Sequence, residues 1–415
     1  MTLTTPKSLR LHFGLYGRRN VGKSSVLNAI TNSQLAIVSE VAGTTTDPVE
    51  KAMELPPLGP VLLIDTAGLD DEGTLGSLRI KKTYDTLSRI DLGLIVIEPK
   101  KWSSLEDQLL QKLVDLKIPL IVIINKVDLA KPAPKVINKL KALNLTYVCF
   151  SATKKLGIEK LCQAILAIAP KNFLDHSGII GDLIAPQETV LQIIPIDQAA
   201  PKGRLLLPQQ QLLRELLELQ AISVIIKETE IKSALAKLAE LPKLVVTDSS
   251  IFGLVAKQLP KDLWLTGYSI LFARAKGELI TQAAAASKIN QLPQGASILI
   301  CEACTHHPTG DDLARVKIPR LLQQFVGHDL NFTIVSGKEF PENLSTYQLV
   351  VHCGACMLNR QEMLSRILRC QKSGVPITNF GLLLGQINGI LERALLPFPE
   401  ALHAYLNAKN QSSSR

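Results

Sequence analysis

A glycine-rich loop near the N-terminus constrains the fold of this chain more than any other feature. Residues 17–24 read GRRNVGKS, the G-x-x-x-x-G-K-S pattern, between an apolar run at residues 11–16 and a helical stretch at residues 25–30. Glycines allow backbone amides to close around phosphate groups, and the N-terminus of the following helix adds positive potential there. The pattern therefore predicts a strand, a phosphate-binding loop and a helix, in that order.

The side chains of this loop supply contacts that a nucleoside triphosphate and its metal need. Lys23 can reach the outer phosphates, and the Ser24 hydroxyl can bind magnesium. We expect Lys23 to take part in catalysis as well as in binding. The predicted phosphate-binding positions are Gly17, Asn20, Val21, Gly22, Lys23, Ser24 and Ser25.

A second segment fits the magnesium ion and the third phosphate. The apolar residues 62–64 read as a buried strand and run into the sequence DTAG at residues 65–68. In this Asp-x-x-Gly pattern, Asp65 can hold the magnesium shell, and the amide of Gly68 can sense the third phosphate. A loop that responds to hydrolysis is therefore expected after this strand.

Two later segments predict that the base is guanine. An apolar run leads into Asn125, Lys126 and Asp128, and the Asp128 carboxylate can accept both N–H groups of guanine, a pair that adenine lacks. Ser151 and Ala152 follow a further strand and fit the loop that closes on the base. This order of motifs at strand ends resembles the GTPases of the translation-factor class, which implies an N-terminal GTP-binding domain.

Two details resemble the TrmE and Era branch of that class. Residues 43–47 read GTTTD where the first switch is expected, and Thr45 is the threonine expected to complete the magnesium shell. Asn20 matches the asparagine with which that branch recruits potassium, although asparagine also favours turns by itself. Leu69 stands where Ras-like GTPases have a water-orienting glutamine, so we expect slow intrinsic hydrolysis that potassium or a dimer contact accelerates.

Composition narrows the class of protein. The chain has 415 residues, 46% of them hydrophobic, which suits two or three domains with buried cores. No apolar stretch reaches membrane-spanning length and residues 1–16 lack a signal-peptide pattern, so a cytoplasmic protein without a membrane partner is expected. The net charge of +9 permits contact with nucleic acids. However, only 4% of residues are aromatic, and the sequence has no basic stripe in which aromatic residues alternate with lysine or arginine. No nucleic-acid partner is therefore expected.

Proline and glycine positions divide the chain into three α/β domains. Residues 1–170 alternate between strands and helices and are expected to form the P-loop GTPase domain, with a mostly parallel sheet. A small middle domain is expected at residues 178–266, where the apolar helix face at residues 209–218 is either core or a subunit interface. Residues 267–407 predict an open doubly wound sheet, a fold that binds ligands beyond the carboxyl ends of its strands.

Two groups of thiol and imidazole side chains lie in that third domain. Cys304 and His306 follow its first strand, and His352, Cys353 and Cys356 lie at the end of its third strand. Both groups are therefore expected at one edge of the sheet. Three thiolates can hold an iron-sulfur cluster or zinc, and they leave one coordination position for another ligand.

A four-cysteine zinc site is the alternative to a three-thiolate site. It would pair Cys301 and Cys304 with Cys353 and Cys356. However, the long stretch between the two pairs exceeds the spacing of a typical zinc ribbon. Cys301 also continues an apolar strand, and free cysteine is often buried in protein cores, so core packing is its expected role.

The pattern Cys-x-His, a long spacer and His-Cys-x-x-Cys resembles the HydF family, the GTPases of iron-iron hydrogenase maturation. The resemblance spans all three domains. It implies that the first domain binds GTP, the second mediates assembly of a homodimer, and the third holds a 4Fe-4S cluster through Cys304, Cys353 and Cys356. It also implies a scaffold that receives a di-iron precursor, made with two radical-SAM maturases, and delivers it to apo iron-iron hydrogenase.

The roles of the two histidines stay open at this point. His306 and His352 could each be an exchangeable fourth ligand of the cluster, or could each orient a cysteine from outside the ligand shell. The function also has an alternative of another class, a ribosome or RNA-processing GTPase of the TrmE and Era branch with a zinc-stabilised C-terminal domain. The same first domain would serve both functions.

Overall fold

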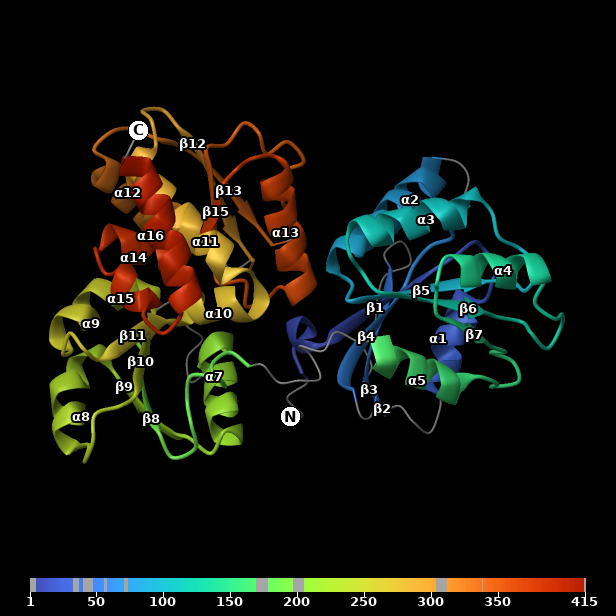
Figure 1. Cartoon of the computed structure of the whole chain (residues 1–415), viewed down its shortest axis with the longest axis horizontal. Coiled ribbons are helices and arrows are strands. Elements are labelled where there is room, and N and C mark those ends of the chain that lie inside the picture. The colour runs from blue at the N-terminus through green and yellow to red at the C-terminus, as the bar shows by residue number, and fades with distance from the viewer. Residues whose placement is uncertain are drawn as a thin grey trace. The chain divides into compact units, whose positions relative to one another are not determined.

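The structure is a computed structural model that describes residues 5–32, 37–39, 48–55, 58–70, 74–168, 178–196, 205–303, 312–337 and 339–413. The chain divides into two compact units, Met1–Asp175 and His176–Arg415 (Figure 1). None of the helices formed by the described residues has the length and apolar character that crossing a membrane requires.

A mixed sheet forms the centre of the first unit. Its strands are β1 (Leu11–Tyr16), β2 (Ile37–Ser39), β3 (Val49–Leu55), β4 (Gly59–Asp65), β5 (Leu92–Ile97), β6 (Leu120–Ile124) and β7 (Tyr147–Cys149). Within the described part of the chain, their order is β2-β3-β4-β1-β5-β6-β7. The β2–β3 and β3–β4 pairs are antiparallel, and the other neighbouring pairs are parallel. The predicted mostly parallel sheet is confirmed.

Helices cover both faces of this sheet because its central strands are apolar on both sides. β1, β5 and β6 are buried along their whole length. The helical elements are α1 (Lys23–Thr31), α2 (Thr74–Asp85), α3 (Ser104–Asp115), α4 (Pro134–Ala142) and α5 (Ile158–Ile168), with 3-10 turns η1 (Lys7–Leu9) and η2 (Thr86–Arg89). Apolar side chains of α1 and α5 pack on one face, and those of α3 and α4 pack on the other (Figure 1).

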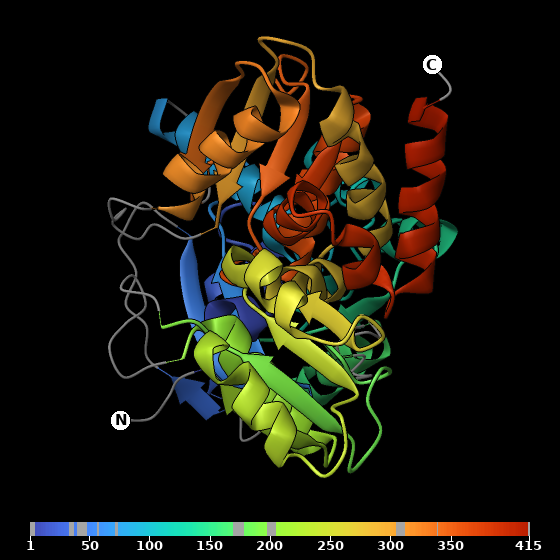
Figure 2. The same ribbon diagram turned by 90° about the vertical axis from the view of Figure 1, so that its left-hand side faces the viewer.

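Two parallel sheets form the frame of the second unit (Figure 2). The first contains β8 (Thr189–Ile193), β9 (Ile222–Ile226), β10 (Leu244–Thr247) and β11 (Trp264–Gly267), in the order β11-β10-β8-β9. The second contains β12 (Ser297–Glu302), β13 (Asn331–Ser336), β14 (Leu349–His352) and β15 (Ile377–Asn379), in the order β13-β12-β14-β15. The second of these sheets corresponds to the open doubly wound sheet that the sequence predicts for the third domain, and β11 of the first sheet was not predicted.

One hydrophobic core runs through both sheets of the second unit. It includes Val190 of β8, Val245 of β10, Ile300 of β12 and Val351 of β14. The α-helices are α7 (Leu207–Glu218), α8 (Ile231–Lys237), α9 (Phe252–Gln258), α10 (Tyr268–Lys276), α11 (Leu279–Ala286), α12 (Ile318–Val326), α13 (Arg360–Lys372), α14 (Phe380–Ile387), α15 (Leu391–Leu395) and α16 (Pro399–Ser413). The shorter turns are η3 (Glu228–Glu230), η4 (Ser249–Ile251), η5 (Ser287–Gln291) and the π-helix η6 (Leu313–Lys317). The middle and third domains expected from the sequence thus share a core, and their separation stays a prediction.

One expected helix is split. The sequence predicts a continuous helix over residues 313–325, but the structure has the π-helix η6 followed by α12. Pro319 at the start of α12 has no backbone N–H, so it cannot donate to the carbonyl oxygen of Arg315. The missing bond interrupts the α-helical ladder at this point, and a wider turn precedes it.

Candidate functional site

Two glycines shape the phosphate loop between β1 and α1. Gly17 has φ +146°, and a Cβ atom there would lie 2.3 Å from the carbonyl oxygen of Val96. Gly22 has φ +95°, and a Cβ atom there would lie 2.4 Å from Nδ2 of Asn125. Neither position has room for a side chain, so the glycines let the loop fold closely against the strand ends.

Asn20 adopts the left-handed backbone conformation, with φ 59°. Asparagine tolerates this conformation better than most residues, which agrees with the turn role that its type predicts. Its carbonyl oxygen accepts a hydrogen bond of 2.5 Å from Nζ of Lys126, and the same ammonium pairs with Glu98 at 2.7 Å. The backbone of Asn20 thereby connects the phosphate loop to the segment predicted to recognise the base.

Lys23 and Ser24 lie at the start of α1 and face the end of β4. Nζ of Lys23 donates to the carbonyl oxygens of Gly17 and Arg18 at 3.0 and 2.9 Å. The Ser24 hydroxyl donates to Oδ2 of Asp65 at 2.6 Å. Oδ1 of Asp65 is buried and has no hydrogen-bond partner among the described residues. Burial raises the pKa of Asp65, and its bond to Ser24 opposes that rise. A buried carboxylate oxygen without a donor fits a site for a cation such as magnesium.

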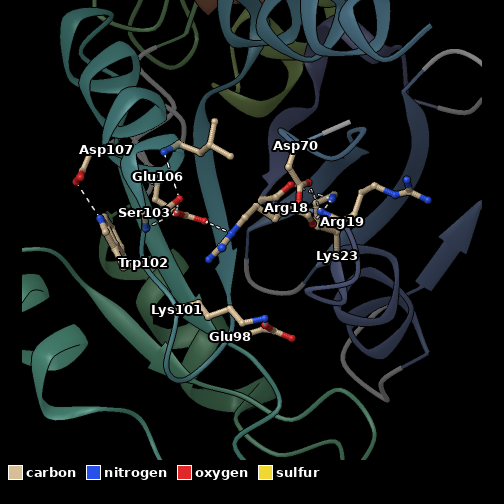
Figure 3. Close-up of polar contacts among 12 residues, drawn as sticks. Arg18, Arg19, Lys23, Asp70, Glu98, Lys101, Trp102, Ser103, Glu106 and Asp107 are labelled. Carbon is tan, nitrogen blue, oxygen red and sulfur yellow. Dashed lines mark hydrogen bonds and ion pairs between the residues drawn. The ribbon is translucent and has the colours of Figure 1, made fainter. Parts of the chain in front are cut away.

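The Asp-x-x-Gly segment folds back onto the phosphate loop. The backbone N–H of Leu69 donates to the carbonyl oxygen of Gly17 at 3.2 Å. The backbone N–H of Arg19 donates to Oδ1 of Asp70 at 2.6 Å (Figure 3). A Cβ atom on Gly68 would lie 2.9 Å from the backbone nitrogen of Arg19, so this close approach requires glycine. Sequence reasoning missed Asp70, because its partner is a backbone amide that no motif identifies.

A buried ion pair links the phosphate loop to α3. Nε of Arg18 donates to Oε1 of Glu106 at 2.8 Å, and Glu106 is fully buried (Figure 3). Oε2 of Glu106 accepts from the backbone N–H and the hydroxyl of Ser103, both at 2.7 Å. The bonds between Ser103 and Glu106 belong to the capping box that begins α3. The start of this helix is therefore tied to the phosphate loop.

The segments predicted to recognise the base meet at the ends of β6 and β7. Nδ2 of Asn125 donates to the carbonyl oxygen of Val21 at 2.9 Å, and its Oδ1 accepts the N–H of Ala152 at 3.2 Å. Ser151 is fully buried beside this contact. Asp128 is exposed, so a base can approach its carboxylate. Asn125 thus holds the phosphate loop and the loop after β7 in one arrangement.

The second candidate site lies where the C-terminal sheet reverses its strand order. From β12 the chain moves to β13 on one side, and from β14 it moves to β15 on the other side. β12 and β14 are neighbours, and Cys301 lies beside His352 in their parallel register. The segments that follow these two strands therefore emerge at the switch point, where ligands bind in doubly wound sheets.

Hydrogen bonds join these two segments next to the predicted cluster ligands. The N–H of Cys353 donates to the carbonyl oxygen of Cys301 at 2.8 Å, and the N–H of Ala303 donates to Sγ of Cys353 at 3.1 Å. Cys353 and Cys356 are partly buried. Amide donors stabilise a thiolate ligand, and Ala303 directly precedes Cys304. The amide of Ala303 therefore suits a thiolate ligand at Cys353.

Three predicted site residues, Thr45, Cys304 and His306, lie outside the described residues. Within the part of the chain that the structure describes, no group of three or more His, Cys, Asp and Glu side chains is arranged to hold a metal ion. Cys353 and Cys356 are the two predicted cysteine ligands whose surroundings are described.

Cys301 is fully buried in a cluster of apolar side chains beneath this edge. Burial raises the pKa of its thiol well above the usual range, although Arg366 opposes that rise. These surroundings agree with the core role expected for Cys301 and disfavour the four-cysteine zinc site.

Both ring nitrogens of His352 are engaged inside the protein. Nδ1 lies 2.9 Å from the carbonyl oxygen of Cys353, and Nε2 lies 3.0 Å from the guanidinium of Arg366. Because the guanidinium only donates, Nε2 must accept, which assigns the ring proton to Nδ1. Burial, together with Arg366, lowers the pKa of His352 to about 3. The neutral ring would have to give up one of these bonds before it could bind a metal.

Sequence reasoning also missed two buried cations at this site, Lys276 and Arg366. Lys276 at the end of α10 is 7% exposed, and Arg366 in α13 is 3% exposed. Nζ of Lys276 donates to backbone carbonyl oxygens after Cys353, and Arg366 donates to His352 and to the carbonyl oxygen of Gly337. A lysine or arginine in a helix is most often on the surface, so only the packing reveals these two.

The arrangement of the first unit defines the class of this protein. A phosphate loop, an Asp-x-x-Gly turn and an Asn-Lys-x-Asp segment lie at the carboxyl ends of β1, β4 and β6 of one sheet, and a family model described as a 50S ribosome-binding GTPase matches residues 12–126. The chain is a P-loop GTPase with a further α/β unit. Models of the hydrogen maturase F dimerization and tetramerization domains match residues 179–277 and 281–397. The chain belongs to the HydF family of hydrogenase maturation GTPases.

Similarity to tRNA modification GTPases is confined to part of the chain. MnmE of Paraburkholderia xenovorans is 35% identical over 156 residues, which cover 37% of this chain and 33% of that protein. MnmE of Cyanothece sp. is 37% identical over 158 residues, which cover 38% of this chain and 34% of that protein. The chain thus spans about a third of the length of these relatives.

Two solved structures match part of this chain with low TM-scores. The G domain of FeoB from T. maritima is 26% identical with a TM-score of 0.30, and covers 38% of this chain and 98% of its own. Era from Aquifex aeolicus is 22% identical with a TM-score of 0.33, and covers 52% of this chain and 92% of its own.

Proposed function

We propose that this chain is a GTP-hydrolysing scaffold of the cytoplasm that binds a 4Fe-4S cluster and delivers a di-iron precursor to apo iron-iron hydrogenase. One observation carries the proposal. The N–H of Ala303 contacts Sγ of Cys353 at the switch point of the C-terminal sheet, in a chain that also carries a complete phosphate loop. Two radical-SAM maturases would supply the precursor.

The nucleotide site that we propose uses the first unit alone. Lys23 and the amide of Gly68 would contact the outer phosphates, and the hydroxyls of Ser24 and Thr45 would bind magnesium with Asp65 nearby. The buried, unpartnered Oδ1 of Asp65 supports this placement of the cation. The ion would neutralise charge that develops on the phosphates during hydrolysis.

We predict that Asp128→Ala removes the preference for guanine. The carboxylate is exposed and open to the base, and loss of a charged hydrogen bond weakens binding by roughly 10- to 100-fold. GTP affinity should fall by that factor, and affinity for ATP should not change. Binding of labelled GTP and ATP checks this, with Asp115→Ala as a control that removes an exposed carboxylate at the end of α3. Equal binding of GTP and ATP by the unaltered protein would contradict guanine recognition.

We predict that potassium accelerates hydrolysis several-fold over sodium through the Asn20 amide. Asn20→Gly tests this directly, because glycine adopts the same left-handed backbone without the amide. The variant should bind GTP normally and hydrolyse it at equal rates in the two salts. Potassium stimulation that survives in Asn20→Gly would leave Asn20 with its turn-forming role alone.

We propose that Cys304, Cys353 and Cys356 hold the cluster and that its fourth position is exchangeable. His352 would act from outside the ligand shell, since its two nitrogens already bond Cys353 and Arg366. His306 remains the candidate fourth ligand. A cluster held in this way can bind a transient group at one iron while three thiolates retain it.

We propose that the chain forms a homodimer through the unit that matches the dimerization domain. Strand β9 is at an edge of its sheet, and Ile222 and Ile225 on this strand are 47% and 42% exposed. Leu217 of the neighbouring helix α7 is 62% exposed. An exposed apolar edge strand can pair with a second copy of itself, and pairing would bury these side chains.

A further inference from the structure

A buried lysine lies directly behind the loop that carries Cys353 and Cys356. Lys276 ends α10, and its Nζ donates to three backbone carbonyl oxygens, those of Ala355 at 3.5 Å, Cys356 at 3.0 Å and Leu358 at 2.9 Å. Burial lowers the pKa of Lys276 to about 8, and the thiolates of Cys356 and Cys353 oppose that fall. One ammonium group thus contacts three peptide units of this loop.

The same peptide units contact the predicted ligand from the other side. In a trans peptide, the C=O and the following N–H point in opposite directions. The carbonyl oxygens of Ala355 and Cys356 accept from Lys276, so the N–H groups of the same peptide units, those of Cys356 and Met357, point away from the ammonium. Burial raises the pKa of the Cys356 thiol, and these two amides and the charge of Lys276 oppose that rise.

The loop needs an external contact to keep this shape. Ala355 has φ 54°, the left-handed conformation that residues with a Cβ atom rarely adopt, at a cost of about 1 kcal/mol. The bonds from Lys276 fix the carbonyl groups on both sides of this turn. Among the described residues, the charged groups that raise the pKa of Lys276 are Cys356 and Cys353, so its charge faces this cysteine pair.

We propose that Lys276 is a positioning residue of the cluster site, which fixes the peptide groups of the loop that carries Cys356 and offsets the negative charge of the thiolate-bound cluster. The inference rests on the proposed function, that is, on cluster binding by Cys304, Cys353 and Cys356. Reduction of the cluster adds a negative charge beside this ammonium. Lys276 therefore makes the reduction potential more positive than it would be beside a neutral side chain.

Three replacements of Lys276 separate the effect of its positive charge from the effect of its hydrogen bonds to the loop. Lys276→Gln keeps a hydrogen-bond donor without the charge, Lys276→Arg keeps both, and Lys276→Met removes both. Lys372→Met removes an exposed lysine of α13 and is the matched control. For each full-length variant, reconstituted with iron and sulfide, we would measure iron per chain and the midpoint potential by redox titration followed by electron paramagnetic resonance.

The expected order of potentials is specific. Lys276→Gln should shift to a more negative potential at nearly full iron content, and Lys276→Arg and Lys372→Met should match the unaltered protein. Lys276→Met should share the negative shift and lose at least half of its iron. A potential in Lys276→Gln equal to that of the unaltered protein would overturn the inference, whether or not Lys276→Met folds. Absence of a cluster from the unaltered protein would instead refute the proposed function.

Discussion

Replacing Cys304, Cys353 or Cys356 with alanine is expected to abolish most bound iron. A cluster that loses one of three thiolates keeps two, which rarely retain it. GTP hydrolysis should continue in each variant, because the nucleotide site lies in the unit Met1–Asp175 and the cysteines lie in His176–Arg415. Iron per chain, the visible absorption of the reconstituted protein and the GTPase rate check this expectation.

Cys301→Ala is the matched control for this set. It removes a thiol three residues before Cys304, but this thiol is fully buried in the apolar cluster beneath the site. Its iron content should equal that of the unaltered protein, and the smaller side chain should cost stability of roughly 1 to 2 kcal/mol. If Cys301→Ala lost its iron while Cys304→Ala kept it, the ligand assignment would be wrong. A colourless protein that binds zinc through four cysteines would contradict the iron-sulfur proposal as a whole.

Lys23→Ala is expected to reduce GTP turnover by about 100-fold or more while leaving iron content unchanged. The ammonium of Lys23 lies within the phosphate loop and is predicted to contact the outer phosphates, and removal of one such donor commonly costs two to three orders of magnitude in rate. Iron loading should persist because the cysteines belong to the other unit. Single-turnover hydrolysis and iron analysis of the same preparation measure both effects.

The control for this variant is Lys160→Ala, which removes an exposed lysine from α5. Its turnover and iron content should equal those of the unaltered protein. If GTP hydrolysis controls partner exchange, Lys23→Ala should also fail to activate apo-hydrogenase despite carrying a cluster. Full turnover by Lys23→Ala would show that the phosphate loop is not the site of hydrolysis.

Most of the fold could be predicted because its signals are local. Apolar runs such as residues 11–16 and 121–124 become buried parallel strands, since a strand covered on both faces needs continuous apolar sequence. The separation of the two C-terminal domains could not be tested in this way, because a core shared by β8 and β12 depends on packing between distant segments.

The nucleotide site was predictable for the same reason. Gly17 and Gly22 occupy backbone positions with no room for a Cβ atom, so the shape of the loop requires glycine at two fixed positions of the sequence. The role of Asp70 requires no such recognisable residue pattern. The Asp70 carboxylate accepts from the backbone N–H of Arg19. Every residue type except proline has this N–H group, so no sequence motif identifies the contact.

The sequence by itself determined the class of the first domain, the family resemblance and the identity of the predicted cysteine ligands. These features depend on side chains of a particular type at a fixed spacing, which a sequence motif shows directly. Only the tertiary structure decided what surrounds those ligands. It places Arg366 against His352, which fixes the ring as a neutral acceptor, and buries Lys276 behind Cys356. These contacts join segments far apart in the chain, so they depend on how helices pack beside strand ends, and no short pattern encodes that packing.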